Sequence, residues 1–165
     1  MRMCALVSAA LTLVTFTVSA QTNAKHSSTV GTWKLDVAKS TFGSEPPPKS
    51  MTLTILKDTP QACSWRVDAV DEKGQAASFS WSGPQDGSLH PVKDAKGQTL
   101  GQESLKLEQD GSLVRRGTDN DGNSFEAHAK LSEDGNTITD ALTMKTKDGK
   151  TVPQTWIYRR VLHGK

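Results

Sequence analysis

Short runs of alternating apolar and polar residues cover most of the chain. Met51, Leu53 and Ile55 alternate with threonines, and Phe79 and Trp81 alternate with serines. A period of two residues is typical of a strand with one buried face, and no segment carries a long pattern with a helical period. The sequence therefore predicts strands and no long helix. The strands are expected in 30–37, 51–58, 63–72, 75–83, 103–110, 112–119, 123–133, 136–147 and 151–161.

Pairs of an aspartate or a lysine followed by glycine separate these runs. Asp-Gly is the preferred centre of a two-residue hairpin turn, in which both central residues take a positive φ. Such turns join antiparallel neighbours, and the connections are too short for parallel crossovers. Segment 83–101 is less regular, and we expect a loop-rich connection with one short strand there. The pairs are Lys73-Gly74, Asp86-Gly87, Lys96-Gly97, Asp110-Gly111, Asp121-Gly122, Asp134-Gly135 and Asp148-Gly149.

A meander of about nine strands would leave two exposed edges unless the sheet closed on itself. The even spacing of the hairpins favours closure over an open two-layer sandwich, which is the alternative. We therefore predict an all-β fold, an antiparallel up-and-down meander β-barrel of about eight to ten strands. The strand that carries Trp33 is expected to pair with the strand that carries Tyr158.

Gly31-Thr32-Trp33, at the start of the first predicted strand, resembles the Gly-x-Trp signature of the calycins, which include lipocalins and fatty-acid-binding proteins. The end segments GTWKLDVAKSTFGSEPPPKSMTLTI and TWIYRR are similar to those of bacterial exported lipocalin-like proteins. The resemblance implies that Trp33 closes one end of the barrel under an arginine from the last strand, in a favourable cation–π contact. Arg159 and Arg160 are both candidates for this arginine, and Gly31 would let the backbone pass close to the tryptophan.

The sequence departs from both families elsewhere. The segment GTDNDGN from Gly117 lacks the aromatic residue of the second lipocalin motif. The Arg-x-Tyr order of the fatty-acid-binding proteins is reversed here, as Tyr158-Arg159-Arg160. Tyr158 and Arg160 share one face of the strand and form a candidate anion clamp. The fatty-acid ligand class does not transfer on this reversed order.

The first 20 residues have the composition of a signal peptide. Arg2 precedes an apolar stretch that is shorter than the ~20 residues of a membrane span, and small residues precede a cleavage site after Ala20. We expect a signal peptide at 1–20, a flexible segment at 21–28, one barrel domain at 29–163, and export to the periplasm or outside the cell. Cys63 would be the remaining cysteine, either buried or paired between molecules, so no internal disulfide is expected.

Charge and motifs exclude several functions. The formal net charge is +2, which gives no basic field for nucleic acid or for an anionic membrane. The histidines, His26, His90, His128 and His163, lack metal-ligand spacing. We therefore expect no metal and no cofactor. The sequence contains no motif of a nucleophile or a phosphate loop, so we name no catalytic residue and expect a protein that is not an enzyme.

Large apolar side chains remain as candidates for a function. A barrel of about eight strands is either filled by side chains or holds one small ligand. The leading hypothesis is non-catalytic binding of a small hydrophobic or amphipathic ligand. A structural or protein-interaction module with a filled core and a barrel enzyme are the alternatives. A cavity of roughly 300 Å³ or more would favour binding. The candidate ligand-binding residues are Trp65, Phe79, Trp81, Phe125, Trp156 and Tyr158.

Overall fold

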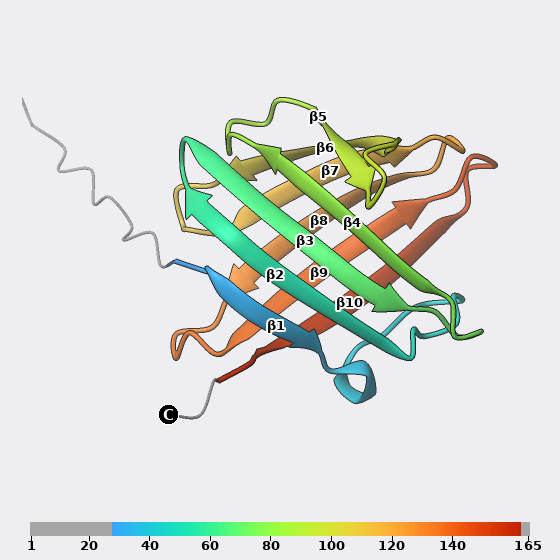
Figure 1. The fold of residues 1–165 in the computed structure, drawn as a ribbon, viewed down its shortest axis with the longest axis horizontal. Coiled ribbons are helices and arrows are strands. Elements are labelled where there is room, and N and C mark those ends of the chain that lie inside the picture. Colours follow the sequence, from blue (N-terminus) through green and yellow to red (C-terminus); the bar gives the residue numbers. More distant parts are fainter. Residues whose placement is uncertain (1–27, 163–165) are drawn as a thin grey trace, which may run out of the picture.

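The computed structural model describes residues 28–162, which form a closed barrel of ten antiparallel strands. Each strand lies beside its neighbours in the chain, and β1 (Gly31–Leu35) closes the barrel against β10 (Thr151–Arg160). Trp33 is opposite Arg160 and Leu35 is opposite Tyr158 across this junction. The predicted all-β meander barrel and its closure are therefore confirmed. In Figure 1, β1–β4 cross one layer of the barrel and β7–β10 cross the other.

The remaining strands follow in chain order and vary in length. A 3-10 turn, η1 (Val37–Lys39), lies between β1 and the three prolines. The other strands are β2 (Ser50–Thr59), β3 (Ala62–Val70), β4 (Ala76–Gly83), β5 (His90–Asp94), β6 (Thr99–Leu107), β7 (Leu113–Asp119), β8 (Ser124–Leu131) and β9 (Thr137–Lys145).

The hairpin turns differ from the predicted type. Among the described residues only glycines have a positive φ, so no Asp-Gly pair forms a turn with two such residues. In the β3–β4 turn the amide of Gly74 donates to the carbonyl of Asp71, and the Asp71 carboxylate accepts from the amides of Lys73 and Gln75. This is a three-residue loop with glycine in the left-handed position. In this turn the acid three residues before the glycine fixes the loop through its side chain.

The alternating pattern places apolar side chains inside the barrel. On β3, Cys63, Trp65 and Val67 are buried, whereas Arg66 is exposed. A register shift between Ile55 and Lys57 interrupts the alternation on β2. β4 and β5 pair at the register positions Phe79–Asp94 and Ser80–Lys93, so their ladder is short.

Trp33 is completely buried at the junction of the first and last strands. The guanidinium of Arg160 lies 4.1 Å from the centre of its ring. Arg159 instead donates a hydrogen bond from Nη1 to the hydroxyl of Thr137 on β9. Arg160 is therefore the arginine that packs on the tryptophan. Gly31 has a φ of 140°, and an added Cβ would lie 3.0 Å from Arg160 Nη1. The Gly-x-Trp spacing thus gives this arginine room beside the backbone.

The predicted signal peptide at 1–20 lies outside the described residues, as do most of segment 21–28 and His163. Within 28–162, the structure contains no helix with the length and apolar character needed to cross a membrane.

Candidate functional site

The interior of the barrel contains a cavity of about 510 Å³, lined mainly by apolar side chains from β2 to β10. This volume exceeds the roughly 300 Å³ that distinguishes a binding cavity from a filled core. Within it, the Trp65 and Phe79 rings meet edge to face with centres 6.1 Å apart. Of the candidate ligand-binding residues, the structure places Trp65, Phe79, Phe125, Trp156 and Tyr158 in the cavity wall.

Trp81 does not line this cavity, so its assignment to the wall is corrected. It is 2% exposed, and it stacks against Trp65 with ring centres 6.4 Å apart. Its indole N–H donates to the backbone carbonyl of Glu103 at 2.9 Å, which connects β4 to β6 past the short β5. Trp81 faces inward as Phe79 does, but it packs inside the wall instead of facing the open space.

We expect Trp81→Phe to reduce stability more than it changes the affinity for any molecule that the cavity binds. The change removes the indole N–H and leaves the buried Glu103 carbonyl without this donor, at a cost of about 1–3 kcal/mol. Urea denaturation and ligand titration measure the two effects. Trp156→Phe is the matched control, because Trp156 lines the cavity and its indole N–H bonds the nearby Gln154 side chain. A Trp81→Phe protein with normal stability and weakened ligand binding would contradict this assignment.

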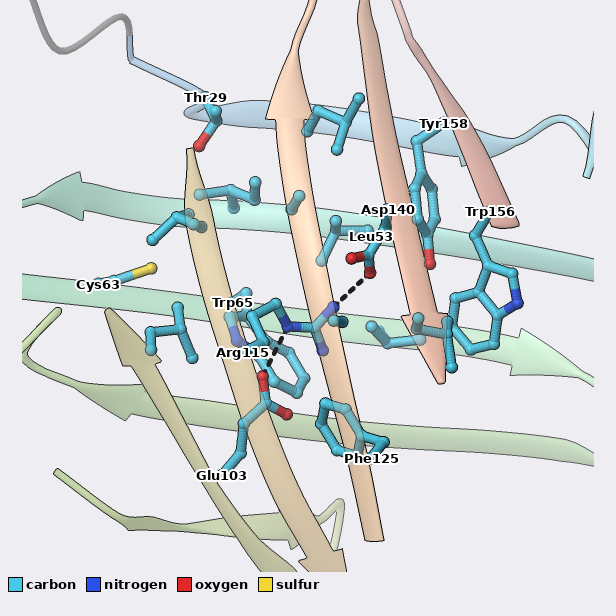
Figure 2. Close-up of a pocket in the computed structure, with 18 of the residues that line it drawn as sticks. Thr29, Leu53, Cys63, Trp65, Glu103, Arg115, Phe125, Asp140, Trp156 and Tyr158 are labelled. Carbon is cyan, nitrogen blue, oxygen red and sulfur yellow. Dashed lines mark hydrogen bonds and ion pairs between the residues drawn. The ribbon is translucent and has the colours of Figure 1, made fainter. Parts of the chain in front are cut away.

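A group of three charged residues crosses the cavity wall (Figure 2). Arg115 Nε donates to Glu103 Oε1 at 2.8 Å, and Arg115 Nη1 donates to Asp140 Oδ2 at 2.6 Å. These residues come from β7, β6 and β9, and all of them line the cavity. The guanidinium also lies 6.0 Å from the Trp65 ring and 5.5 Å from the Phe125 ring. We call Glu103, Arg115 and Asp140 the charged triad.

Burial governs the ionisation of this region. It raises the pKa of Glu103, and the charge and hydrogen bond of Arg115 oppose that rise. Burial also disfavours the charged form of Arg115, but Glu103 and Asp140 outweigh it and raise the pKa of the guanidinium. Burial and then the charge of Asp140 raise the pKa of Tyr158. The triad therefore holds a permanent cation between two acids, beside a neutral phenol.

The charged triad was not predicted from the sequence. Each member occupies an inward position of an alternating strand, where an apolar residue is expected: Asp140 lies between Ile138 and Leu142 on the buried face of β9. A charged residue that interrupts the apolar face of a strand was the available signal, because such a residue must find a partner inside the fold. The pattern does not say which partner.

The candidate anion clamp is not assembled. Arg160 is occupied at the end of the barrel, where its Nε donates to the Gly135 carbonyl at 2.8 Å and its Nη1 donates to the Val30 carbonyl at 2.9 Å. The Tyr158 hydroxyl instead lies 3.2 Å from the Met51 sulfur, within the cavity wall. Arg115, which no motif singled out, is the arginine that faces the cavity.

Cys63 is buried in the wall of the cavity, in agreement with the first of its two interpretations. Burial raises the pKa of its thiol to about 11, so the thiol stays protonated at neutral pH. Across residues 28–162, no group of three or more His, Cys, Asp and Glu side chains is arranged to hold a metal ion.

Comparison with solved structures gives the fold independently. A crystal structure of a mutant of the fluorescent protein UnaG superposes with a TM-score of 0.53 at 15% sequence identity. The match covers 81% of this chain and 96% of the UnaG chain. A de novo designed fluorescence-activating β-barrel matches with a TM-score of 0.48 at 13% identity, over 84% of this chain and 96% of the design. No protein-family model and no curated protein sequence matches this chain. The similarity to UnaG supports the calycin-like barrel fold.

Proposed function

We propose that this protein binds one small, partly apolar molecule inside its barrel and does not act on it chemically. The observation that carries the proposal is the cavity of about 510 Å³, which lies within the range of small-molecule sites. Its wall combines aromatic and aliphatic side chains with a few polar groups, the composition typical of such sites.

The two other functions have less support. A structural module with a filled core does not require a cavity of this volume. A barrel enzyme would need an acid or a histidine inside the cavity, and Glu103 and Asp140 are such acids. Both are bonded to Arg115 and their side chains are 4% and 2% exposed. A carboxylate held in this way is poorly placed to take a proton from a bound molecule.

We also propose that the protein acts outside the cytoplasm, after cleavage following Ala20. The support is the N-terminal sequence alone, with its single arginine, apolar stretch and small residues before the cleavage site. N-terminal sequencing of the mature protein from its own host should begin at Gln21. An intact N-terminus on the soluble protein would contradict this proposal.

Native mass spectrometry of the protein purified from its own host tests the binding function. We expect a mass excess that disappears on denaturation, in the wild type and in Ala141→Leu. Ala129→Leu should lose most of it, because Ala129 lines the cavity and a larger side chain there occupies ligand space. Ala141 is the matched control, because it lies on the exposed face of β9. A wild-type protein without a mass excess, or an equal excess in both variants, would contradict binding in this cavity.

A further inference from the structure

The charge balance of the triad constrains the chemistry of the ligand. One cation, Arg115, lies between two acids, Glu103 and Asp140, so the triad carries one excess negative charge when both acids are ionised. The other charged residues at the cavity, Asp110, Asp119, Lys130 and Glu133, are exposed, so water and salt screen their effect on a buried ligand.

The accessible part of the triad is the arginine. The Arg115 side chain is 24% exposed, whereas the carboxylates of Glu103 and Asp140 are almost completely covered. Arg115 uses its Nε and Nη1 groups for the two carboxylates, and its Nη2 group has no hydrogen-bond partner among the described residues. Figure 2 shows the guanidinium between the two acids, with Trp65 and Phe125 beside it. A ligand would therefore meet hydrogen-bond donors whose positive charge is already compensated.

Asp140 shows a second feature of this kind within residues 28–162, a polar atom without a hydrogen-bond partner. Its Oδ1 atom is buried and has no hydrogen-bond partner within the described part of the chain. A buried, unpaired carboxylate oxygen is costly, and an added anion nearby would increase that cost. Replacement of such ion groups by apolar residues is often neutral or stabilising, so stability alone does not account for a charged triad inside a cavity.

We propose, on the basis of the binding function above, that the ligand presents an uncharged hydrogen-bond acceptor, such as an amide carbonyl, to Arg115 and that the cavity discriminates against carboxylates. A carbonyl oxygen accepts an N–H of the guanidinium and adds no charge. A carboxylate makes the same bond but brings a further negative charge next to Glu103 and Asp140 in a poorly solvated site. The specificity therefore comes from the repulsion as much as from the new bond.

The test compares dodecanamide with dodecanoate, which share one alkyl chain and differ in the charge of the head group. Binding is measured at pH 8, where the free acid is ionised, by isothermal titration calorimetry. We expect the amide to bind the wild type at least about tenfold more tightly, because one charge a few ångströms away contributes that much at the effective dielectric of a protein site. This comparison requires no variant.

A charge-neutralising variant tests whether the triad is the cause. Glu103→Gln removes one negative charge and keeps an oxygen for Arg115, so it should shift the preference toward dodecanoate by about tenfold. Glu126→Gln is the matched control: Glu126 pairs with Arg116 at 2.8 Å on the exposed outer face, so this variant changes the net charge equally but not in the cavity. We expect Glu126→Gln to leave the preference of the wild type unchanged.

The outcomes separate the two proposals. If dodecanoate binds the wild type as tightly as dodecanamide, or if both variants shift the preference equally, the charge discrimination is overturned while ligand binding stands. If neither probe binds and host protein carries no small molecule, the binding function is overturned, and the discrimination with it. The proposal is supported if the wild type prefers the amide, and if Glu103→Gln reduces this preference while Glu126→Gln leaves it unchanged.

Discussion

Replacing Trp33 with alanine is expected to lower the free energy of unfolding by about 3–5 kcal/mol, the range for removing a large buried aromatic side chain. Trp33 has no exposed surface, and its indole N–H donates to the Thr29 carbonyl at 2.9 Å. The guanidinium of Arg160 covers the ring. The loss would leave a void where the first and last strands meet. Because a domain of this size has about 5–15 kcal/mol in total, the urea midpoint should fall markedly.

A double-mutant cycle shows whether the stacked pair acts as a unit. Arg160→Ala should cost about 1–3 kcal/mol, and the double variant should lose less than the sum of the single losses, because each single change already removes the cation–π contact. Arg159→Ala is the control. Arg159 is 46% exposed and bonds Thr137, so its effect should be small and additive with that of Trp33→Ala. A Trp33→Ala protein with an unchanged midpoint would mean that the tryptophan does not hold the barrel closed.

The fold was predictable because its signals are local. Alternation with a period of two fixes the buried face of each strand, and a turn signal between short runs fixes an antiparallel meander. The turn type was not predictable from the Asp-Gly pairs alone, because the preceding acid also competes for the backbone amides. In the β7–β8 turn, which contains Asp121-Gly122, Asp119 accepts from the amides of Asp121 and Asn123, so a three-residue loop replaces the two-residue hairpin.

The charged triad was not predictable, because it depends on how neighbouring strands are aligned in two strand pairs and on the space that a small side chain leaves between its members. Across β6 and β7, Arg115 is opposite Leu105 and Glu103 is opposite Gly117, so the ion pair is diagonal. Asp140 lies on β9, beyond β8, where Ala127 is opposite Arg115. The small side chain of Ala127 leaves room for the guanidinium to reach across. Alternation predicts that these residues face inward, but no pattern within one strand shows which of them meet.

The same limit explains the correction at Trp81. Parity places Trp81 and Phe79 on the same inward face of β4, and both are indeed opposite inward residues of β3, Trp65 and Val67. Position along the strand decides the rest: Phe79 borders the cavity, whereas Trp81 is enclosed where β4 and β5 separate and its indole reaches Glu103. Whether a side chain lines the cavity thus depends on packing between strands. The alternation along one strand shows only that the side chain faces inward.

Replacing Arg115 with methionine is expected to lower the free energy of unfolding by about 3–5 kcal/mol at neutral pH. Methionine keeps most of the apolar stem, so the main change is electrostatic. Glu103 and Asp140, whose side chains are 4% and 2% exposed, would remain as buried carboxylates without their cation. Breaking a buried ion pair from one side is more costly than removing the whole pair, because the remaining charges lack a partner.

The loss of stability in Arg115→Met is expected to increase as the pH rises from acidic to neutral. Burial raises the pKa of Glu103 and Arg115 opposes that rise, so the pKa should lie higher still in the variant. A folded-state pKa above the unfolded value gives stability that is present below the unfolded pKa and is lost as pH rises through the folded pKa. Urea denaturation should therefore show Arg115→Met close to the wild type near about pH 4 and well below it at neutral pH.

Two further variants separate charge from packing. Arg116→Met changes the neighbouring residue, whose side chain is 56% exposed and pairs with Glu126 on the outer face, and should alter stability by no more than about 0.5 kcal/mol. Adding Glu103→Gln and Asp140→Asn to Arg115→Met removes both unpaired charges and should recover much of the loss at neutral pH. If the deficit of Arg115→Met were equal at both pH values and unchanged in the triple variant, Arg115 would act through its packing alone, and the triad would not be an electrostatic unit.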